Sequence, residues 1–358
     1  MNDLNPGGSV RPGEALPLET LLPWLAQHCP QLTGTPRITQ YSGGASNWTY
    51  CLAFAEQEVI LRRAPAGKKA KGAHDMAREH NIQQALQPHF PLVPTMLGLG
   101  QDTAVMDSDF YLMDKVEGFI PRRNLPKSLA LSSGQTRALC QSAIDTLVQL
   151  HQVDIHATGL AAIGKGEGYI ERQILGWNKR YRNAKTWNVG SGKTVMHWLQ
   201  ANLPKTERQA LIHNDFRLDN LVLDPNQPDK VLAVLDWELA TIGDPLMDLG
   251  NSLAYWVQAD DDPVIRANRR QPTNAPGMMT RQQVIDYYCK QAGIECDDFT
   301  FYEVYGLFRL AGIVQQLYHR YHHKQTRNPA FKNLWLFTNY LLWRCQRLIK
   351  ASGRKAAA

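Results

Sequence analysis

The sequence predicts an α+β fold of two lobes, in which a small sheet-containing lobe is followed by a larger helical lobe. Residues 36–63 have the short hydrophobic period of strands and contain a glycine turn. Residues 73–87 change to a helical period, with apolar side chains near one face. Most of the chain after residue 117 keeps the helical period. A sheet segment followed by many helices is typical of an α+β chain.

The composition is that of an ordinary globular protein. Of the 358 residues, 44% are hydrophobic and 20% are charged, so the chain can bury a sizeable core. The net charge of +6 indicates an anionic ligand, and we find no nucleic-acid recognition motif. The six cysteines form no C-x-x-C pair, which indicates reduced thiols in a cytoplasmic protein. We find no signal peptide and no membrane-spanning apolar run, so no membrane partner is expected.

We expect three segments along the chain. Residues 1–35 form an N-terminal extension with a short helix at residues 18–28, which we expect to be interrupted near Pro23. Residues 36–116 form the small lobe. Residues 117–358 form the helical lobe.

The small lobe is predicted to be a sheet with one helix laid on it. Residues 36–63 indicate strand, glycine turn, strand, turn and strand. The helix at residues 73–87 follows. Residues 103–118 return to strands, which we expect to end at Gly118.

The helical lobe contains one predicted hairpin. A capping-box pattern at Ser132 begins one helix, and residues 168–184 form a second helix that is amphipathic and basic. Residues 220–236 predict two short strands joined by a Pro/Asn/Asp turn, and the second strand ends at Asp236. Helical patterns continue from Asp244 to the end of the chain.

The segment LIHNDFRLDN, residues 211–220, gathers polar and charged side chains between apolar flanks. We expect it to be a loop between a helix and the hairpin. Because so many polar groups are costly to bury without a ligand, this density indicates a binding site. Asp215 and Asn220 are spaced as in H-x-D-x-x-x-x-N, the catalytic loop of kinase-like phosphotransferases.

Phosphoryl transfer explains these residue types. Asp215 can accept the proton of a hydroxyl that attacks the γ-phosphate. Arg217 can neutralise charge on the transferring phosphoryl group. Asn220 offers a neutral oxygen to Mg²⁺, and Asp236 supplies a carboxylate for the same metal. The segment is therefore predicted to bind a triphosphate with its metal.

Two motifs, HNDFRLDNLVLD and VLDWELATIGDPLMDLG, closely resemble the aminoglycoside phosphotransferase family in sequence, order and separation. Members of that family are kinase-fold enzymes that phosphorylate small molecules. VILRRAPAGK, FYLMDKVEG and GYIERQILGW further resemble one branch, the kinase-like domain fused to some acyl-CoA dehydrogenases. The resemblance covers residues 36–325 and implies a bilobal protein-kinase-like fold that uses ATP and Mg²⁺.

The resemblance also implies a nucleotide site in the small lobe. Arg62 stands where most kinases keep a lysine on the α- and β-phosphates, and Glu79 matches the ion-pair partner of that lysine. The loop expected to cover the phosphates contains Ser42, Gly43, Gly44, Ser46 and Asn47. The hinge expected to meet the adenine contains Met113, Asp114 and Val116.

Two positions depart from the family pattern. Arg62 replaces lysine, and a planar guanidinium is not equivalent to a point charge, although arginine is usual in this branch. Asn214 stands where relatives mostly carry glycine. Asn tolerates positive φ better than most residues, so the loop conformation is not excluded.

Other polar residues near these motifs have simpler structural explanations. We expect His213 to form structural hydrogen bonds rather than to act as a base. Asp219 is expected to be a loop or ion-pair residue. Asp244 and Asp248 are expected to cap a helix and to brace the loop.

Charge is the main indication of the acceptor. Residues 161–193 carry seven basic side chains and two acidic ones, with Tyr169, Trp177 and Tyr181 among them. Such a helix suits an anionic, partly flat ligand better than a polycation, although a solvated helix face is the alternative. With the resemblance, this favours a small-molecule hydroxyl acceptor such as a hydroxyacyl-CoA. An aminoglycoside antibiotic kinase and a nucleotide-binding pseudokinase with an interaction role are the alternatives, and the oligomeric state stays open.

Overall fold

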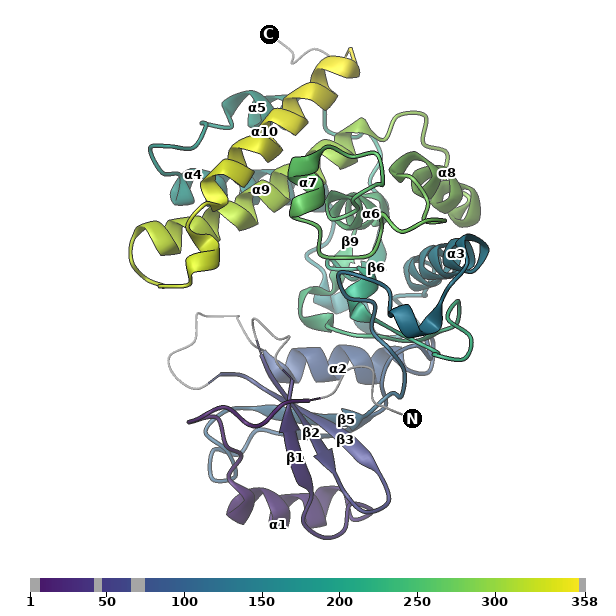
Figure 1. Ribbon diagram of the computed structural model, residues 1–358, viewed down its shortest axis with the longest axis vertical. Coiled ribbons are helices and arrows are strands. Elements are labelled where there is room, and N and C mark those ends of the chain that lie inside the picture. Colours follow the sequence, from purple (N-terminus) through teal and green to yellow (C-terminus); the bar gives the residue numbers. More distant parts are fainter. Residues whose placement is uncertain (1–6, 42–46, 66–74, 354–358) are drawn as a thin grey trace. The chain divides into compact units, whose positions relative to one another are not determined.

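A computed structural model describes residues 7–41, 47–65 and 75–353 of the chain (Figure 1). The chain divides into two units. The first combines Met1–Pro121 with Asn220–Leu239, and the second combines Arg122–Asp219 with Ala240–Ala358. The predicted hairpin therefore belongs to the same unit as the N-terminal sheet, from which it is distant in sequence.

The first unit contains an antiparallel five-stranded sheet in the order β1–β2–β3–β5–β4. Its strands are β1 (Arg37–Gln40), β2 (Trp48–Ala53), β3 (Glu58–Arg63), β4 (Met96–Gly100) and β5 (Phe110–Asp114). The three strands predicted at residues 36–63 are confirmed. In the register, Arg62 of β3 pairs with Thr49 on one side and Tyr111 on the other, so Arg62 lies inside the sheet.

The sequence analysis missed β4. Its segment MLGLG carries two glycines, which weaken a strand pattern. Packing requires the second of them, because a Cβ atom on Gly100 would lie 2.2 Å from the ring of Phe110. Of the strands expected at residues 103–118, only β5 forms, and the residues directly before it make turns.

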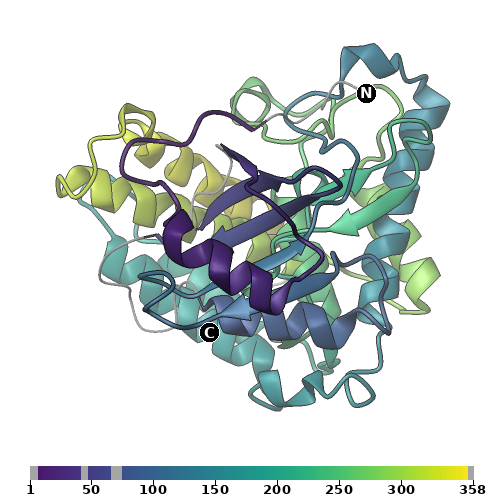
Figure 2. The same cartoon turned by 90° about the horizontal axis from the view of Figure 1, so that it is seen from below.

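Two helices cover opposite faces of this sheet, α1 (Leu18–His28) and α2 (Met76–Leu86) (Figures 1 and 2). Successive residues of a strand point to opposite faces of a sheet. Accordingly, Leu61 packs in the cluster that contains α1, whereas its neighbour Ile60 packs in the cluster that contains Met76 of α2. The helix predicted at residues 73–87 is confirmed within the described residues.

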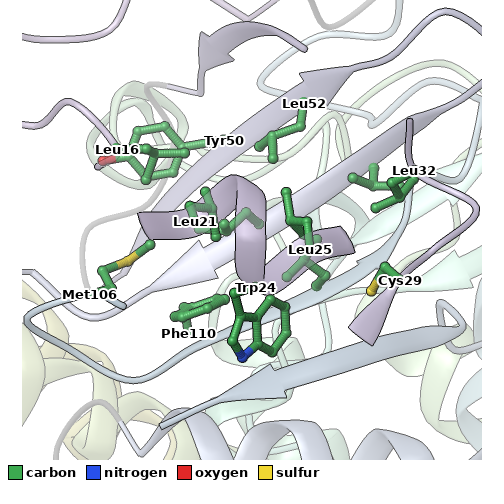
Figure 3. Close-up of a cluster of buried hydrophobic side chains, with 13 residues drawn as sticks. Leu16, Leu21, Trp24, Leu25, Cys29, Leu32, Tyr50, Leu52, Met106 and Phe110 are labelled. Atoms are coloured by element: carbon green, nitrogen blue, oxygen red, sulfur yellow. The ribbon is translucent and has the colours of Figure 1, made fainter. Parts of the chain in front are cut away.

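The buried side chains between α1 and the sheet are shown in Figure 3. Trp24 packs edge-on against Phe110, with ring centroids 4.9 Å apart, and Leu21 and Leu25 are buried. Burying each such side chain stabilises the fold by about 1.5–3 kcal/mol. The helix continues through Pro23, so the predicted interruption is wrong, because this apolar face outweighs the local effect of the proline.

The hairpin of the first unit consists of β7 (Leu221–Leu223) and β8 (Val231–Val234), as predicted. Phe119, which follows the sheet in the chain, forms a β-bridge with Leu223. Gly118 permits this approach, because a Cβ atom there would lie 2.5 Å from the carbonyl oxygen of Leu223. The N-terminal chain and the hairpin are thus joined by backbone hydrogen bonds.

The second unit is mostly helical, as predicted. Its helices are α3 (Ser133–His151), α4 (Tyr169–Ala184), α5 (Lys193–Ala201), α6 (Pro245–Ala254), α7 (Pro263–Ala267), α8 (Arg281–Ala292), α9 (Thr300–His322) and α10 (Leu334–Ala351). α9 packs against α4, α6 and α10. Two short strands, β6 (Ala210–Ile212) and β9 (Thr241–Gly243), form a separate antiparallel pair. The polar segment, residues 211–220, therefore begins within a strand, whereas a helix was expected to precede it.

Side-chain caps begin several helices of this unit, among them α3 and α6. The capping box at Ser132 is confirmed, because its side chain accepts a hydrogen bond from the amide of Gln135 and the Gln135 side chain accepts one from the amide of Ser132. Asp244 caps α6 by accepting hydrogen bonds from two backbone amides, as expected. In the part of the chain that the structure describes, no helix is both long and apolar enough to cross a membrane.

Candidate functional site

Arg62 is the centre of a charged cluster in the first unit. Its side chain lies on the same face of the sheet as α2, because it alternates with Leu61 along β3. Nη1 of Arg62 lies 3.2 Å from Oε1 of Glu79 on α2, and Nη2 lies 3.0 Å from Oδ1 of Asp236. Tyr111, which pairs with Arg62 across the sheet, donates its hydroxyl to Oε1 of Glu79 at 2.9 Å. The expected ion pair between Arg62 and Glu79 is therefore present.

Burial makes this cluster electrostatically unusual. Burial raises the pKa of the Glu79 carboxyl, and the Arg62 guanidinium opposes that rise. Burial also disfavours the charge on Arg62, but Glu79, Tyr111 and Asp236 outweigh it and raise the pKa of the guanidinium well above its ordinary value. Nε of Arg62 and Oε2 of Glu79 are buried, and neither has a hydrogen-bond partner among the described residues. Such atoms are costly unless a bound group completes their hydrogen bonds.

The two predicted metal ligands lie at one end of the hairpin. Leu221 of β7 pairs with Val234 of β8, and the amide of Leu235 donates to the carbonyl oxygen of Asn220 at 2.8 Å. Asp236 follows directly with a φ of 70°, a left-handed conformation that costs free energy for a residue other than glycine. The side chain of Asp236 is 33% exposed. The carboxylate is thus held in a strained position where a ligand can reach it.

Asn47 is the described member of the loop expected to cover the phosphates. It is buried, and its side-chain amide donates to Oε2 of Glu238 at 3.3 Å. Glu238 lies in the 3₁₀ helix η4 (Trp237–Leu239), directly after Asp236. The other predicted loop residues, Ser42, Gly43, Gly44 and Ser46, lie outside the described residues.

The predicted hinge lies at the end of β5. Met113 is buried and pairs with Ile60 of β3. The amide of Asp114 donates to the carbonyl oxygen of Thr95 at 2.9 Å. Val116 follows the strand and is half-buried. The hinge segment is therefore fixed to the sheet as far as Lys115, whose amide donates to the carbonyl oxygen of Glu58 in β3 at 3.4 Å.

In the second unit, Asp248 of α6 braces the polar segment that follows β6. Its Oδ2 accepts from the amide of His213 and its Oδ1 accepts from the amide of Asn214, both at 2.8 Å. Nε2 of His151 lies 3.1 Å from Oδ2 of the same carboxylate. Burial opposes ionisation of Asp248, but its hydrogen bonds to His151 and His213 outweigh burial and lower its pKa. The expected loop-bracing role is confirmed.

The backbone bends sharply at Asn214, where φ is 63°. This is the position at which the family resemblance leads us to expect glycine, and Asn is one of the few other residues that adopt such a φ readily. The side chain of Asn214 accepts hydrogen bonds from the Tyr169 hydroxyl and from Asn251, both at 3.2 Å. The amide of Asp215, the next residue, donates to Nδ1 of His213 at 3.3 Å, so His213 has the structural role expected for it.

Arg217 lies between two carboxylates of the segment. Its Nη2 is 3.4 Å from Oδ2 of Asp215, and its Nε is 3.1 Å from Oδ1 of Asp219. Its guanidinium also lies over the ring of Tyr255, 4.9 Å from the ring centroid. These contacts hold Arg217 in place, and about a fifth of its side chain stays exposed.

The structure thus brings the predicted residues together in two groups. Arg62, Glu79 and Asp236 meet in the first unit, which also contains Asn220. Asp215 and Arg217 meet in the second. Among the described residues, no cluster of three or more His, Cys, Asp or Glu side chains is arranged to hold a metal ion.

Sequence reasoning missed the residues that support these groups. Tyr111, His151 and Tyr255 contact Glu79, Asp248 and Arg217 respectively. The position of Tyr111 could have been inferred only from the register of β3 and β5. The other two contacts depend on helix packing, for which the sequence carries no local pattern.

The sheet unit and the helical unit define a protein-kinase-like phosphotransferase fold. Comparison with known proteins agrees, because the chain belongs to the phosphotransferase enzyme family, whose model matches residues 37–280. A structure from Ralstonia eutropha, of a protein provisionally designated an aminoglycoside phosphotransferase, superposes with a TM-score of 0.81 and 28% identity over 94% of this chain and 99% of that one. The predicted fold class and family are confirmed.

Two further matches extend this comparison, one in sequence and one in fold. Mouse acyl-CoA dehydrogenase family member 10 is 37% identical over 290 residues, which are 80% of this chain and 27% of the mouse protein. This chain thus spans about a quarter of that relative, and the predicted resemblance to the branch fused to acyl-CoA dehydrogenases is confirmed. A mutant aminoglycoside phosphotransferase, solved with AMP-PNP and hygromycin B, shares the fold at a TM-score of 0.58 and 14% identity over 93% of this chain and 98% of that one.

Proposed function

We propose that this chain is an ATP- and Mg²⁺-dependent kinase that phosphorylates a hydroxyl group of a small molecule. The observation that carries the proposal is the buried pairing of Arg62 with Glu79 and Asp236, beside family membership. In kinases, a basic residue paired with a helix glutamate contacts the nucleotide phosphates. A phosphate would also give a partner to the buried Nε of Arg62, which has none in the described residues.

Asn220 and Asp236 fit the requirements of a Mg²⁺ site. Both offer oxygen atoms, which Mg²⁺ prefers, and two protein ligands are enough when the triphosphate supplies others. Their neighbouring positions at the end of the β7–β8 hairpin make joint binding possible. When bound, the metal would neutralise charge on the phosphates. The relative solved with AMP-PNP binds an ATP analogue on the same fold.

Asp215 is the proposed general base. Its carboxylate would accept the proton of the acceptor hydroxyl, and the neighbouring Arg217 limits its rotation. Because Arg217 is held by Asp215, Asp219 and Tyr255, we infer that it mainly positions the base and adds positive charge near the phosphoryl group. Adenine would meet the backbone of the segment from Met113 to Val116. Catalysis by this set would rest on positioning and charge neutralisation.

For the acceptor, we propose an anionic hydroxylated metabolite such as a hydroxyacyl-CoA. The basic, aromatic helix α4 supports this, since Arg180 lies over the ring of Trp177, 4.6 Å from its centroid. The match to an acyl-CoA dehydrogenase family member points in the same direction. An aminoglycoside is the second candidate, because a relative with the same fold was solved with hygromycin B.

The proposal is tested by ADP release from Mg-ATP across acceptors. The panel contains 4-hydroxybutyryl-CoA, 4-hydroxybutyrate, choline, homoserine and kanamycin. We expect turnover with the CoA ester, and a loss of about 10²–10⁴-fold in Asp215→Asn. Asp219→Asn is the matched control, because Asp219 belongs to the same segment and pairs with the same arginine. We expect the turnover rate of Asp219→Asn to fall far less than that of Asp215→Asn.

Two results would change the proposal. If kanamycin alone supports turnover, the acceptor is an aminoglycoside and the proposal of an anionic acceptor is wrong. Binding of ATP without turnover on any acceptor, and with no difference between the wild type and Asp215→Asn, would favour a nucleotide-binding pseudokinase.

A further inference from the structure

Arg309 on α9 is a buried cation without a carboxylate partner in the described parts of the chain. It is 6% exposed. Its Nη2 donates to the carbonyl oxygen of Asn214 at 2.9 Å, and its guanidinium lies over the ring of Trp177, 5.5 Å from the centroid. A guanidinium carries five N–H donors, so these contacts satisfy it only in part. A buried charge is costly unless it is paired.

The polar groups nearest to Arg309 do not supply a compensating negative charge. Burial raises the pKa values of the Tyr169, Tyr255 and Tyr305 hydroxyls, and the charge of Arg309 opposes this rise. These phenols therefore stay neutral at physiological pH. Asp215 already pairs with Arg217, and the carboxylate of Asp248 already contacts His151 and accepts hydrogen bonds from two backbone amides.

A second arginine, which is exposed, contacts the same aromatic ring as Arg309. Arg180 of α4 is exposed, and its guanidinium lies 4.6 Å from the ring centroid of Trp177, the same ring that Arg309 contacts. Trp177 is half-buried and rests on α9 beside Gly312, where a Cβ atom would lie only 3.0 Å from the ring. The glycine lets the indole approach α9 closely, one turn after Arg309. The guanidinium groups of Arg180 and Arg309 therefore share one aromatic ring, that of Trp177.

We propose that Arg309, with Arg180 and Trp177, is a specificity-determining site that binds an anionic oxygen group of the acceptor, either a phosphate or a carboxylate. A planar guanidinium matches both groups through paired hydrogen bonds. Arg309 binds the carbonyl oxygen of the residue directly before Asp215, so an acceptor held there lies near the proposed base. This inference rests on the proposed kinase function, and it adds the group that selects an anionic acceptor over a polycation.

The test measures binding without turnover. Phosphopantetheine is titrated calorimetrically against pantetheine, which lacks only its phosphate, and 4-hydroxybutyrate against its neutral amide. AMP-PNP is present throughout, so that the phosphate probe cannot report on the nucleotide site. In the wild type we expect one anionic probe to bind about tenfold more tightly than its neutral counterpart, and the pair that shows the difference identifies phosphate or carboxylate.

Three variants make the test specific. Arg309→Gln should abolish the preference for the anionic probe, and Arg180→Gln should reduce it. Arg320→Gln, an exposed arginine of the same helix, should leave it unchanged. If Arg309→Gln does not fold, the exposed Arg180 still carries the test. Equal binding of charged and neutral probes by the wild type, or a preference that survives in both Arg309→Gln and Arg180→Gln, would overturn the proposal.

Failure of this inference and failure of the proposed function give different results. Asp215→Asn should keep the charge preference while it loses turnover. Charge-selective binding without turnover on any acceptor would support the recognition site and contradict the proposed kinase function. Turnover in which Arg309→Gln lowers kcat equally for charged and neutral acceptors would show that Arg309 only positions the loop through Asn214.

Discussion

Nη2 of Arg62 donates a hydrogen bond of 3.0 Å to Oδ1 of Asp236, which lies 174 positions later in the chain. The contact joins the central strand β3 to the end of the hairpin within one unit. It connects the residue proposed to hold the phosphates to a residue proposed to hold the metal. The position of one side chain therefore depends on the other.

Arg62→Lys should weaken nucleotide binding. A lysine ammonium is a point charge on a flexible stem, so it cannot hold Glu79 and Asp236 with the fixed fork of a guanidinium. We expect the KM for ATP to rise about tenfold with a smaller change in kcat. Steady-state kinetics would check this, with Arg63→Lys as control, because Arg63 is adjacent and pairs instead with Asp107. An unchanged KM in Arg62→Lys would mean that the fork geometry is unimportant.

Asp236→Asn should raise the Mg²⁺ concentration needed for activity. The substitution keeps the size of the side chain but removes a negative charge that attracts the metal. It also removes the charge partner of Arg62. We expect the half-saturating Mg²⁺ concentration to rise at least about tenfold, measured at fixed ATP. Asp224→Asn, in the turn of the same hairpin, is the control and should behave as the wild type.

Asp248→Asn should lower stability and change its pH dependence. The folded state lowers the pKa of Asp248, so its contribution is fully present above the unfolded value of about 3.9 and is lost as the pH falls through the folded value. At neutral pH we expect a loss of about 3–5 kcal/mol, because the buried carboxylate pairs with His151 and two amides.

Urea unfolding at several pH values would test this prediction. The difference between wild type and Asp248→Asn should shrink as the solution is acidified below about pH 4. Asp286→Asn, on the exposed side of α8, should show neither the loss nor the pH effect. A difference that stays constant at all these pH values would contradict the assigned linkage.

Gly306→Ala should destabilise the second unit. A Cβ atom on Gly306 of α9 would lie 2.1 Å from the carbonyl oxygen of Gly250 on α6, so the two helices would have to separate. We expect a loss of about 1–3 kcal/mol, although alanine is the better helix former. Gly176→Ala in α4 is the control, because its Cβ would meet only the flexible end of Arg180. Denaturant midpoints should move in opposite directions for the two variants.

Much of the fold could be predicted from the sequence because its patterns are local. The strands at residues 36–63, the hairpin after Asn220 and the helix cap at Ser132 were all indicated by period and turn residues. β4 was not predicted because its glycines weaken the strand pattern, although Gly100 is required for packing against Phe110. The predicted break at Pro23 was wrong because the buried apolar face of α1 keeps the helix continuous. Both errors come from tertiary packing that overrides local preference.

For the candidate site, the sequence by itself determined the chemistry. The spacing of Asp215, Asn220 and Asp236 predicts a base and two metal ligands, and residue type alone fixes what those groups can do. Only the tertiary structure decided which residues meet. It paired Arg62 with two carboxylates and bound Asp248 to the backbone directly before Asp215. It also buried Arg309 with no carboxylate partner among the residues that the structure describes. Spacing follows from covalent geometry, whereas contacts between distant residues depend on how whole helices and strands pack.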